Sequence, residues 1–484
     1  MKIIFNTLFS LFLTFYSLSA SGNNIFNVNS FEANDLPGYS TKRIQKAIDN
    51  CSASGGGIVL LPAGDYLSAT IILKDNITLY LMPGARLIAS NKEKDYVVGV
   101  ALEDTGGGSV PMLVYAKKAK NIAIKGEGEI IGQPEYYTES FQYSSFIAED
   151  CDAAIEAGVP LVASRWKKPN VSLVFLSECE NVKIENISLK DSPFWTVHLH
   201  WCNKVFVRGI TIFSKLNVAA NSDGLDIDGC SDVTVSDCII ETGDDAICLK
   251  TTKSADGFRN CENVVVTNCI LSSSSCALKL GTESYGDFKH VLFSNCVVRN
   301  SNRGLGIFIR DGGTAENITF SNIDIECNRK PVGWWGSADA FRFVVLKRND
   351  NSQVGKIKNL SLRDITAYCK GSNRIAGYSS VDDIEKVQIS NVRLFMSSED
   401  TPDRRTKEAF SIIDARDIDI SKLEIEWANK TKEDKWTNSI IFKNIKKLRL
   451  RDNQIVNHSH SHKPILNENI TESDLDEQEI RIKP

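Results

Sequence analysis

The sequence predicts an all-β protein that folds as a right-handed, single-stranded parallel β-helix, a solenoid with a short N-terminal capping helix. Three observations predict it: a short phrase recurs along most of the chain, apolar residues alternate with period two within the phrase, and a turn-forming residue divides its two halves. A fixed phrase with a varying period is typical of solenoid repeats joined by loops of unequal length.

The phrase consists of an alternating apolar segment, one Asn, Asp or Gly, and a second alternating segment, as in residues 182–189 and 205–212. From Ile187 to Ile323, the residue after the bend recurs at intervals of 23, 28, 31, 27 and 27 residues. The alternation makes each half a strand with one inward face, and Asn, Asp and Gly best tolerate the left-handed backbone of a sharp bend. No Leu-rich consensus or Trp-Asp blade mark supports a leucine-rich repeat or a propeller, so we expect roughly ten β-helical coils.

The two ends of the chain have different patterns. Lys2 and the apolar run 3–18 precede small residues, a pattern typical of a signal peptide, which we assign to residues 1–20. In residues 40–51, Ile44, Ala47 and Ile48 have helical spacing after a Ser/Thr start and predict a helix that caps the first coil. We assign residues 21–470 to the catalytic β-helix and 471–484 to a charged tail, and expect an exported protein, periplasmic or extracellular, with no membrane span.

Composition narrows the possible partners. The chain has 42% hydrophobic and 24% charged residues, as folded proteins do. Its formal charge of −5 provides no basic footprint for nucleic acid. Of its 13 cysteines, Cys238, Cys269 and Cys296 fall at one inward position of three successive coils. We interpret them as buried free thiols rather than a disulfide ladder.

Candidate site residues emerge when the second strands of four successive coils are aligned on their apolar positions, which are Leu225/Ile247/Leu278/Ile307 and Ile227/Leu249/Leu280/Ile309. Two outward rows result from this alignment: Asp226, Cys248, Lys279 and Phe308 in one, and Asp228, Lys250, Gly281 and Arg310 in the other. This face therefore carries acids at one end and cations at the other.

Three aspartates precede these strands. Asp223 and Asp245 share a column and Asp244 stands one residue before it. Coils stack about 4.8 Å apart, so the carboxylates are close enough to raise at least one pKa. Glycosidic hydrolysis needs such a set, because one carboxylic acid protonates the leaving oxygen while another carboxylate activates water. A calcium site and turn-forming aspartates at coil corners are the alternatives.

The motifs around these aspartates resemble those of a known family. Asn221-Ser222-Asp223-Gly224 is similar to the Asn-Thr-Asp motif of glycoside hydrolase family 28, the polygalacturonases, and Gly243-Asp244-Asp245 to its Gly-Asp-Asp motif. The resemblance extends over residues 34–378. It implies inverting hydrolysis of a pectic polysaccharide, galacturonan or rhamnogalacturonan, with Asp244 as general acid and Asp223 and Asp245 orienting the water.

Two motifs depart from the family pattern. Ser275-Cys276-Ala277 stands where polygalacturonases carry Gly-His-Gly, and Phe308-Ile309-Arg310 where they carry Arg-Ile-Lys. Both departures are more similar to the rhamnogalacturonan hydrolases of the same family. We predict four substrate-binding residues: Asn221, Lys250, Lys279 and Arg310. The three cations suit a uronate carboxylate. We predict no metal and no cofactor, and a monomer that acts on acidic plant-type polysaccharide or its oligosaccharides.

Several interpretations remain open at this stage. A polysaccharide lyase or a non-catalytic carbohydrate-binding protein could use the same architecture. His198 and His200 alternate on one strand before the site, where packed or hydrogen-bonded roles are expected. The repeat is lost in residues 132–169, and Trp334 and Trp335 lie in a second long loop, so both segments are candidate walls of a sugar-binding groove.

Overall fold

The structure is a computed structural model that describes residues 24–96, 98–101, 109–139, 165–166, 171–215, 218–219, 221–330, 336–399, 405–429, 434–458, 462–476 and 478–482. The predicted signal peptide, most of the segment 132–169, and Trp334 and Trp335 lie outside these residues. In the described part of the chain, no helix has the length and apolar character that a membrane crossing requires.

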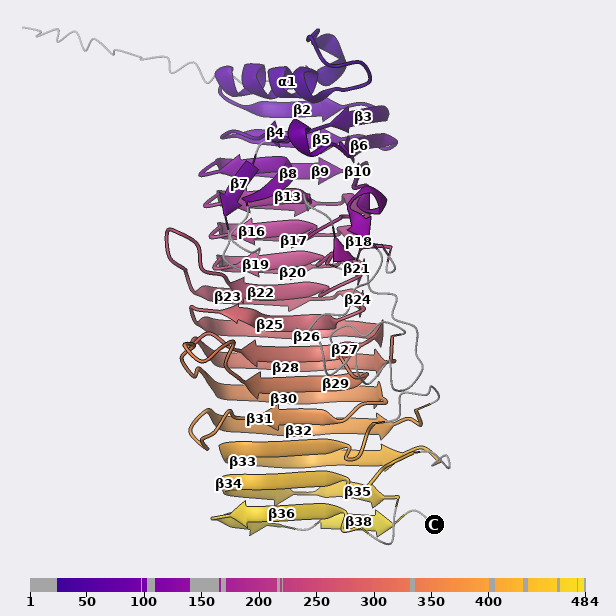
Figure 1. The fold of residues 1–484 in the computed structure, drawn as a ribbon, viewed down its shortest axis with the longest axis vertical. Coiled ribbons are helices and arrows are strands. Elements are labelled where there is room, and N and C mark those ends of the chain that lie inside the picture. The colour runs from indigo at the N-terminus through magenta and orange to yellow at the C-terminus, as the bar shows by residue number, and fades with distance from the viewer. Residues whose placement is uncertain are drawn as a thin grey trace, which may run out of the picture.

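The chain forms the predicted right-handed parallel β-helix, whose coils stack from the capping helix α1 at one end to β38 at the other (Figure 1). Each coil contributes strands to up to three columns of parallel pairing. The first column contains β1 (Ile25–Asn27), β2 (Gly57–Leu61), β5 (Ile77–Leu81), β9 (Lys120–Gly126), β14 (Glu180–Glu185), β17 (Asn203–Arg208), β20 (Ser231–Ser236) and β23 (Cys261–Thr267).

The second column follows the bend in each coil and contains β3 (Gly64–Ser68), β6 (Ala85–Ala89), β10 (Glu129–Ile131), β15 (Ser188–Lys190), β18 (Thr211–Phe213), β21 (Ile239–Thr242) and β24 (Ile270–Ser273). The third column, which carries the aspartates, contains β4 (Ile71–Ile72), β8 (Ser109–Lys117), β13 (Ser172–Ser177), β16 (Val197–His200), β19 (Leu225–Asp228), β22 (Ile247–Thr251), β25 (Cys276–Ser284), β27 (Arg303–Ile309), β29 (Asp339–Val345) and β31 (Asn373–Ala376).

Later coils contain long strands that run through the bend from one column into the next. These are β26 (Phe288–Ser301), β28 (Thr314–Cys327), β30 (Lys356–Cys369), β32 (Ile384–Met396), β33 (Phe410–Trp427) and β34 (Ile440–Arg451). Outside the columns, β7 (Val98–Ala101) pairs antiparallel with β8, and β11 (Thr138–Glu139) with β12 (Arg165–Trp166).

The predicted bend residues adopt the left-handed backbone conformation. The φ angles are 56° at Asn186, 63° at Gly209, 59° at Asp237 and 56° at Asn268. Because each of these residue types reaches positive φ at low cost, the chain can turn sharply between two strands in every coil. The sequence pattern therefore predicted the local cause of the repeat as well as its period.

The core is a continuous apolar column inside the three strand columns. Rings stack along it, as in Phe293 and Phe320, whose centroids are 5.0 Å apart. Cys238, Cys269 and Cys296 lie in it as buried free thiols, and all 12 cysteines in the described residues are free and buried. The thiol interpretation is confirmed for these residues.

Helix α1 (Thr41–Ala53) covers the first coil as predicted, with Ile44, Ala47, Ile48 and Cys51 buried beneath it. Ser40 makes no side-chain cap. Instead, the Asp35 carboxylate accepts hydrogen bonds from the N–H groups of Lys42, at 2.7 Å, and Arg43, at 3.1 Å. A carboxylate at this end is stabilised by the otherwise unsatisfied N–H groups and the helix dipole.

The final coil contains β36 (Ile465–Ile470), β37 (Ser473–Leu475) and β38 (Gln478–Ile482), and it stacks on the coil that holds β34 and β35 (Asn453–Asn457). β37 pairs with β34, and β38 pairs with β35. The predicted boundary at residue 470 therefore falls inside this coil. Charged composition indicated a tail, but an end strand exposes one face and tolerates charge there.

Candidate active site

The three aspartates meet where two third-column strands begin. Asp223 precedes β19 by two residues, and Asp245 precedes β22 by two residues. Since Leu225 pairs with Ile247, the two aspartates share one column as predicted. One side-chain oxygen from each of Asp223, Asp244 and Asp245 lies within 4.8 Å of the other two. All three side chains are buried, with at most 6% exposure.

Two glycines allow the coils to approach closely beside these carboxylates. A Cβ atom on Gly224 would lie 2.5 Å from the carbonyl oxygen of Ala246, and one on Gly243 would lie 2.1 Å from that of Ala219. No side chain fits at such distances, so both positions require glycine. The glycines that follow Asp223 and precede Asp244 thus have a packing cause.

Asp244 is held in place through its backbone carbonyl group. Its carbonyl oxygen accepts hydrogen bonds from the hydroxyls of Thr242 and Ser273, both at 2.6 Å. Burial raises the pKa of the Asp244 carboxyl well above its ordinary value, and the carboxylates of Asp223 and Asp245 raise it further. Asp244 is therefore suited to carry a proton near neutral pH.

Asp245 and Asp223 have different surroundings. The Asp245 carboxylate accepts hydrogen bonds from the Ser275 hydroxyl at 2.8 Å, from the Cys276 N–H at 3.2 Å and from the Lys279 ammonium. These donors orient Asp245 as an acceptor. Burial raises the pKa of Asp223 to about 6, although Lys250 opposes the rise. One buried site thus holds carboxyl groups in unlike environments, which separates acid from base.

Lys250 lies among three carboxylates. Its Nζ is 3.4 Å from Asp223 Oδ2, 3.4 Å from Asp226 Oδ1 and 3.1 Å from Glu283 Oε2. The ammonium also lies 4.2 Å from the centroid of a Trp195 ring, a distance at which the ring face attracts a cation. Burial opposes the charge of Lys250, but the surrounding anionic groups raise its pKa well above the ordinary value. Lys250 therefore offsets part of the negative charge of the acid cluster.

The two ammonium groups also bear on the calcium alternative. Asp223, Asp226 and Cys248 have potential ligand atoms within 4.8 Å of one another, as do the three aspartates. Lys250 already contacts Asp223 and Asp226, and Lys279 contacts Asp245. Because calcium takes 6–8 oxygen ligands, two ammonium groups at these oxygens compete with it directly. The donor set suits acid/base chemistry better than a metal.

The comparison with protein families matches residues 101–407, more than half of the chain, to the family described as glycosyl hydrolases family 28. The chain belongs to glycosyl hydrolases family 28. The predicted family is confirmed, and its match includes all three aspartates and both motifs around them.

Two curated relatives to which this chain is similar are polygalacturonases. A probable polygalacturonase from Vitis vinifera is 25% identical over 293 residues, 58% of this chain and 55% of the relative. An endo-polygalacturonase from Pectobacterium carotovorum subsp. carotovorum is 28% identical over 227 residues, 46% of this chain and 54% of the relative. The chain thus spans about half the length of the curated relatives it matches.

Solved structures support the family fold. A hyperthermoactive exopolygalacturonase from Thermotoga maritima superposes with a TM-score of 0.61 at 23% identity, covering 78% of this chain and 88% of that one. A family 28 exopolygalacturonase from Yersinia enterocolitica gives a TM-score of 0.64 at 21% identity, covering 87% and 78% of the two chains. These likenesses confirm the β-helix.

The register of one coil differs from the predicted alignment of this family 28 chain. Leu278 pairs with Leu305, and Lys279 with Gly306, so the predicted partners Ile307 and Phe308 were wrong by two residues. A shift of two keeps every apolar residue on the same face, and the alternation therefore cannot exclude it. Lys279 still lies near Phe308, with its Nζ 5.9 Å from the ring centroid.

The predicted outward rows also differ from expectation in their exposure. Asp226, Asp228 and Cys248 point away from the apolar core yet are fully buried, and Lys250 and Lys279 are only 3% and 8% exposed. The structure brings both lysines into the aspartate cluster. The uronate-binding roles of Lys250 and Lys279 remain predictions, since each already pairs with carboxylates of the protein.

The other two predicted substrate-binding residues lie at the margins of the described site. Asn221 is half-buried in the loop before β19. Arg310 directly follows β27, and its N–H donates a hydrogen bond to the Ser284 hydroxyl at 2.7 Å. Their contact with substrate remains a prediction.

Sequence reasoning missed several members of the site. Glu283 lies within a register irregularity, between Leu280, which pairs with Leu249, and the next paired residue of β25. Alternation therefore gave no signal for its contact with Lys250. Arg348, beyond β29, lies 3.4 Å from Glu283 and forms a two-pronged pair with Asp311 at 2.7 and 2.9 Å. No sequence motif pointed to Arg348, because its side chain comes from a later coil of the solenoid.

The two histidines take the packed roles that were predicted. His198 Nε2 lies 3.1 Å from Asp228 Oδ2, and His200 Nδ1 lies 3.1 Å from the Ser177 hydroxyl. Burial lowers the pKa of His198, and it lowers that of His200 to about 4. The two histidines lie on β16, where His198 is the register partner of Asp226 and His200 that of Asp228 on β19.

Proposed function

We propose that the chain hydrolyses glycosidic bonds of a pectic polysaccharide, galacturonan or rhamnogalacturonan, by acid/base catalysis. The observation that carries the proposal is the buried set Asp223, Asp244 and Asp245, with one oxygen of each within 4.8 Å of the others. Family membership and the polygalacturonase names of its relatives support the same reaction.

We assign the general acid to Asp244. Its raised pKa keeps the proton available for the departing glycosidic oxygen. Asp245, oriented by Ser275, Cys276 and Lys279, and Asp223, which contacts Lys250, take the proton of the attacking water. The water oxygen bonds to the anomeric carbon and passes a proton to a carboxylate as the C–O bond to the leaving sugar breaks. Asp244 donates its proton to the departing glycosidic oxygen, which leaves as a hydroxyl group.

The stereochemical outcome rests on the family resemblance, which implies inversion. Inverting carboxylate pairs are typically about 6.5–9.5 Å apart, and retaining pairs about 5–5.5 Å. Here three carboxylates share the site, so two of them can flank one water while the third donates the proton. We retain inversion as a prediction with its own test.

We propose an acidic substrate because cations accompany the acids. Lys279 contacts Asp245 at the edge of the cluster, Lys250 lies beside it, and Arg310 follows the strand next to Lys279. A uronate carboxylate can exchange with a protein carboxylate at an ammonium group, and Arg adds a bidentate geometry. We also propose that the protein acts outside the cytoplasm as a monomer, on polymer or oligosaccharide.

The experiment incubates purified protein with homogalacturonan, rhamnogalacturonan and their oligomers, and measures new reducing ends. The expected result is sugar release by wild type and release slower by about 10²–10⁴ for Asp244→Asn. Ultraviolet absorbance from an unsaturated product would identify a lyase instead. No release from any pectic substrate would overturn the proposal.

A further inference from the structure

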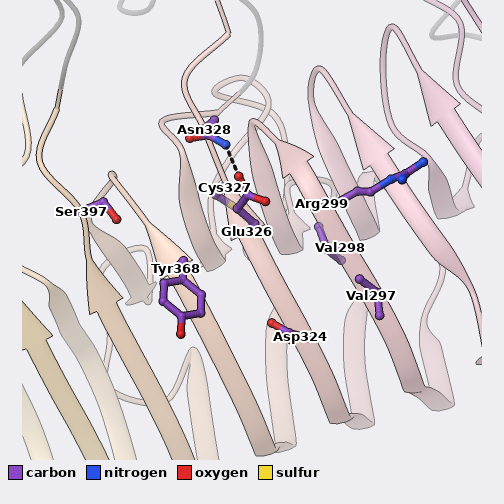
Figure 2. Close-up of a pocket in the computed structure, with 9 residues that line it drawn as sticks. All are labelled: Val297, Val298, Arg299, Asp324, Glu326, Cys327, Asn328, Tyr368 and Ser397. Carbon is purple, nitrogen blue, oxygen red and sulfur yellow. Dashed lines mark hydrogen bonds between the residues drawn. The ribbon is translucent and has the colours of Figure 1, made fainter.

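A second ligand site candidate lies on the face next to the aspartates. An open groove of about 480 Å³ crosses the second-column ends of β26, β28 and β30 (Figure 2). Its size falls within the range of small-molecule sites. Strand β24 of this face leads through Ser274 and Ser275 directly into β25, and Ser275 holds Asp245. The groove and the aspartates therefore occupy adjoining faces of one solenoid.

One wall of the groove is a rigid aromatic ring. Tyr368 is 48% exposed, and its ring stacks on Phe395 of the following coil, with centroids 4.7 Å apart and planes 17° from parallel. The stack supports one face of the ring, and Figure 2 shows the ring beside the groove floor. Since Glu326 is the paired neighbour of Tyr368 on the previous coil, the opposite face is turned toward the groove.

The floor and the far wall supply polar groups. Asp324 and Glu326 rise from β28 between Tyr368 and the pair Val297 and Arg299 (Figure 2). The Glu326 carboxylate accepts a hydrogen bond from the Asn328 amide at 2.7 Å, which orients it. Two coil spacings separate the walls, about 10 Å, which is enough for one sugar ring to stand between them.

We propose that this groove binds a neutral pyranose unit of a polysaccharide. The apolar C–H face of such a ring can pack on Tyr368, and its hydroxyls can donate to Asp324 and Glu326. Arg299 can donate to a ring or hydroxyl oxygen. With two carboxylates and one guanidinium, the lining carries net negative charge and disfavours a uronate. The selectivity is therefore opposite to that proposed for the aspartate site.

The test is affinity electrophoresis of the whole protein in native gels that contain a neutral galactan, polygalacturonate or no polysaccharide. We expect galactan to retard wild type, and Tyr368→Ala to weaken this retardation about tenfold. Tyr378→Ala is the matched control, since Tyr378 is 47% exposed and lies outside the groove lining, and it should migrate as wild type does. Equal melting temperatures would show that all three proteins are folded.

Three results would overturn the proposal: no retardation by galactan, equal retardation of Tyr368→Ala and wild type, or a Tyr368-dependent retardation that is stronger in polygalacturonate. The assay reads binding alone, whereas the hydrolase proposal is read from released reducing ends. Each proposal can therefore fail without the other. Asp324→Asn, which removes an acceptor and a negative charge, should weaken retardation in galactan but not in polygalacturonate.

Discussion

Lys250 and Asp223 form a buried ion pair across one coil step, with Nζ 3.4 Å from Oδ2. The same ammonium contacts Asp226 and Glu283, so one cation lies among three acidic groups, and Arg348 adds a second positive charge at Glu283. A buried charge is tolerated only where partners compensate it. This lysine therefore connects the stability of the site to the protonation of its acids.

Replacing Lys250 should expose that connection. In Lys250→Met the three carboxylates lose their shared counter-ion, a change that costs about 3–5 kcal/mol when a buried pair is broken. We expect a lower melting temperature at pH 7 and an acid limb of the activity profile that moves to higher pH. Lys183→Met removes an exposed lysine of β14 and is the matched control. An unchanged pH profile in a folded Lys250→Met would contradict this role.

Asp244→Asn should separate catalysis from stability. Loss of a general acid lowers kcat by about 10²–10⁴. Burial raises the pKa of Asp244, so folding at pH 7 must protonate a carboxylate that is ionised in the unfolded chain, which costs folding free energy. The amide needs no proton and should raise the melting temperature at pH 7. Asp256→Asn, at an exposed position, should change neither quantity. Full activity of Asp244→Asn would remove Asp244 from the mechanism.

The pH dependence should follow Asp223. Its pKa of about 6, against an ordinary 3.8, means that the folded state holds the proton more tightly than the unfolded state. Its contribution to stability is therefore greatest below pH 4 and is lost as pH rises through 6, by about 3 kcal/mol. We expect Asp223→Asn to melt above wild type at pH 7–8 and together with it near pH 4. Calorimetry at both pH values would check this, and an equal gap at both would refute it.

The same carboxyl group should shape activity. Asp223 can help deprotonate water only when it is ionised, so kcat/KM should rise with pH around 6. Asp244 must stay protonated, so the fall should come only above its raised pKa. A profile of initial rates against pH would reveal a bell displaced upward from ordinary carboxyl pKa values. An acid limb centred near pH 4 would contradict the assignment of Asp223.

Much of this architecture was readable from the sequence because its causes are local. Asn186, Gly209 and Asp237 bend the chain, alternation sets the inward face, and both acids of the column follow from these two facts. The two-residue register error beside Lys279 arose because alternation repeats every two residues and so fits both alignments. The sequence pattern therefore predicts which face of a strand a residue occupies more reliably than it predicts the pairing register between coils.

The rest of the site depended on non-local packing. Asp226 and Lys250 point away from the apolar core, so the sequence pattern predicted that they would be exposed to solvent. Both are buried, and Trp195 and Glu283 contact Lys250. Trp195 lies in the loop before β16, and Glu283 lies within an irregularity in the pairing of β25. Their contacts with Lys250 depend on how the coils stack in three dimensions, which the alternation pattern does not determine.

The thiols provide an independent check of the core. All 12 cysteines in the described residues are buried and free, although the sequence predicts export. Burial should protect the thiols from a soluble disulfide reagent in the native protein, while unfolding in denaturant without reductant should release at least those 12. A thiol count taken before and after unfolding would test this. A much smaller count after unfolding would reveal disulfides and overturn the ladder of free thiols.

The anomeric form of the first product tests how the three carboxylates divide their work. If Asp223 and Asp245 flank a water while Asp244 donates the proton, the water attacks opposite the leaving sugar and the new reducing end has the inverted configuration. If a carboxylate attacked instead, the configuration would be retained through a covalent intermediate. Proton NMR spectra recorded before the anomers equilibrate distinguish these outcomes. We expect the inverted anomer first, and a retained anomer would reassign Asp223 or Asp245 as a nucleophile.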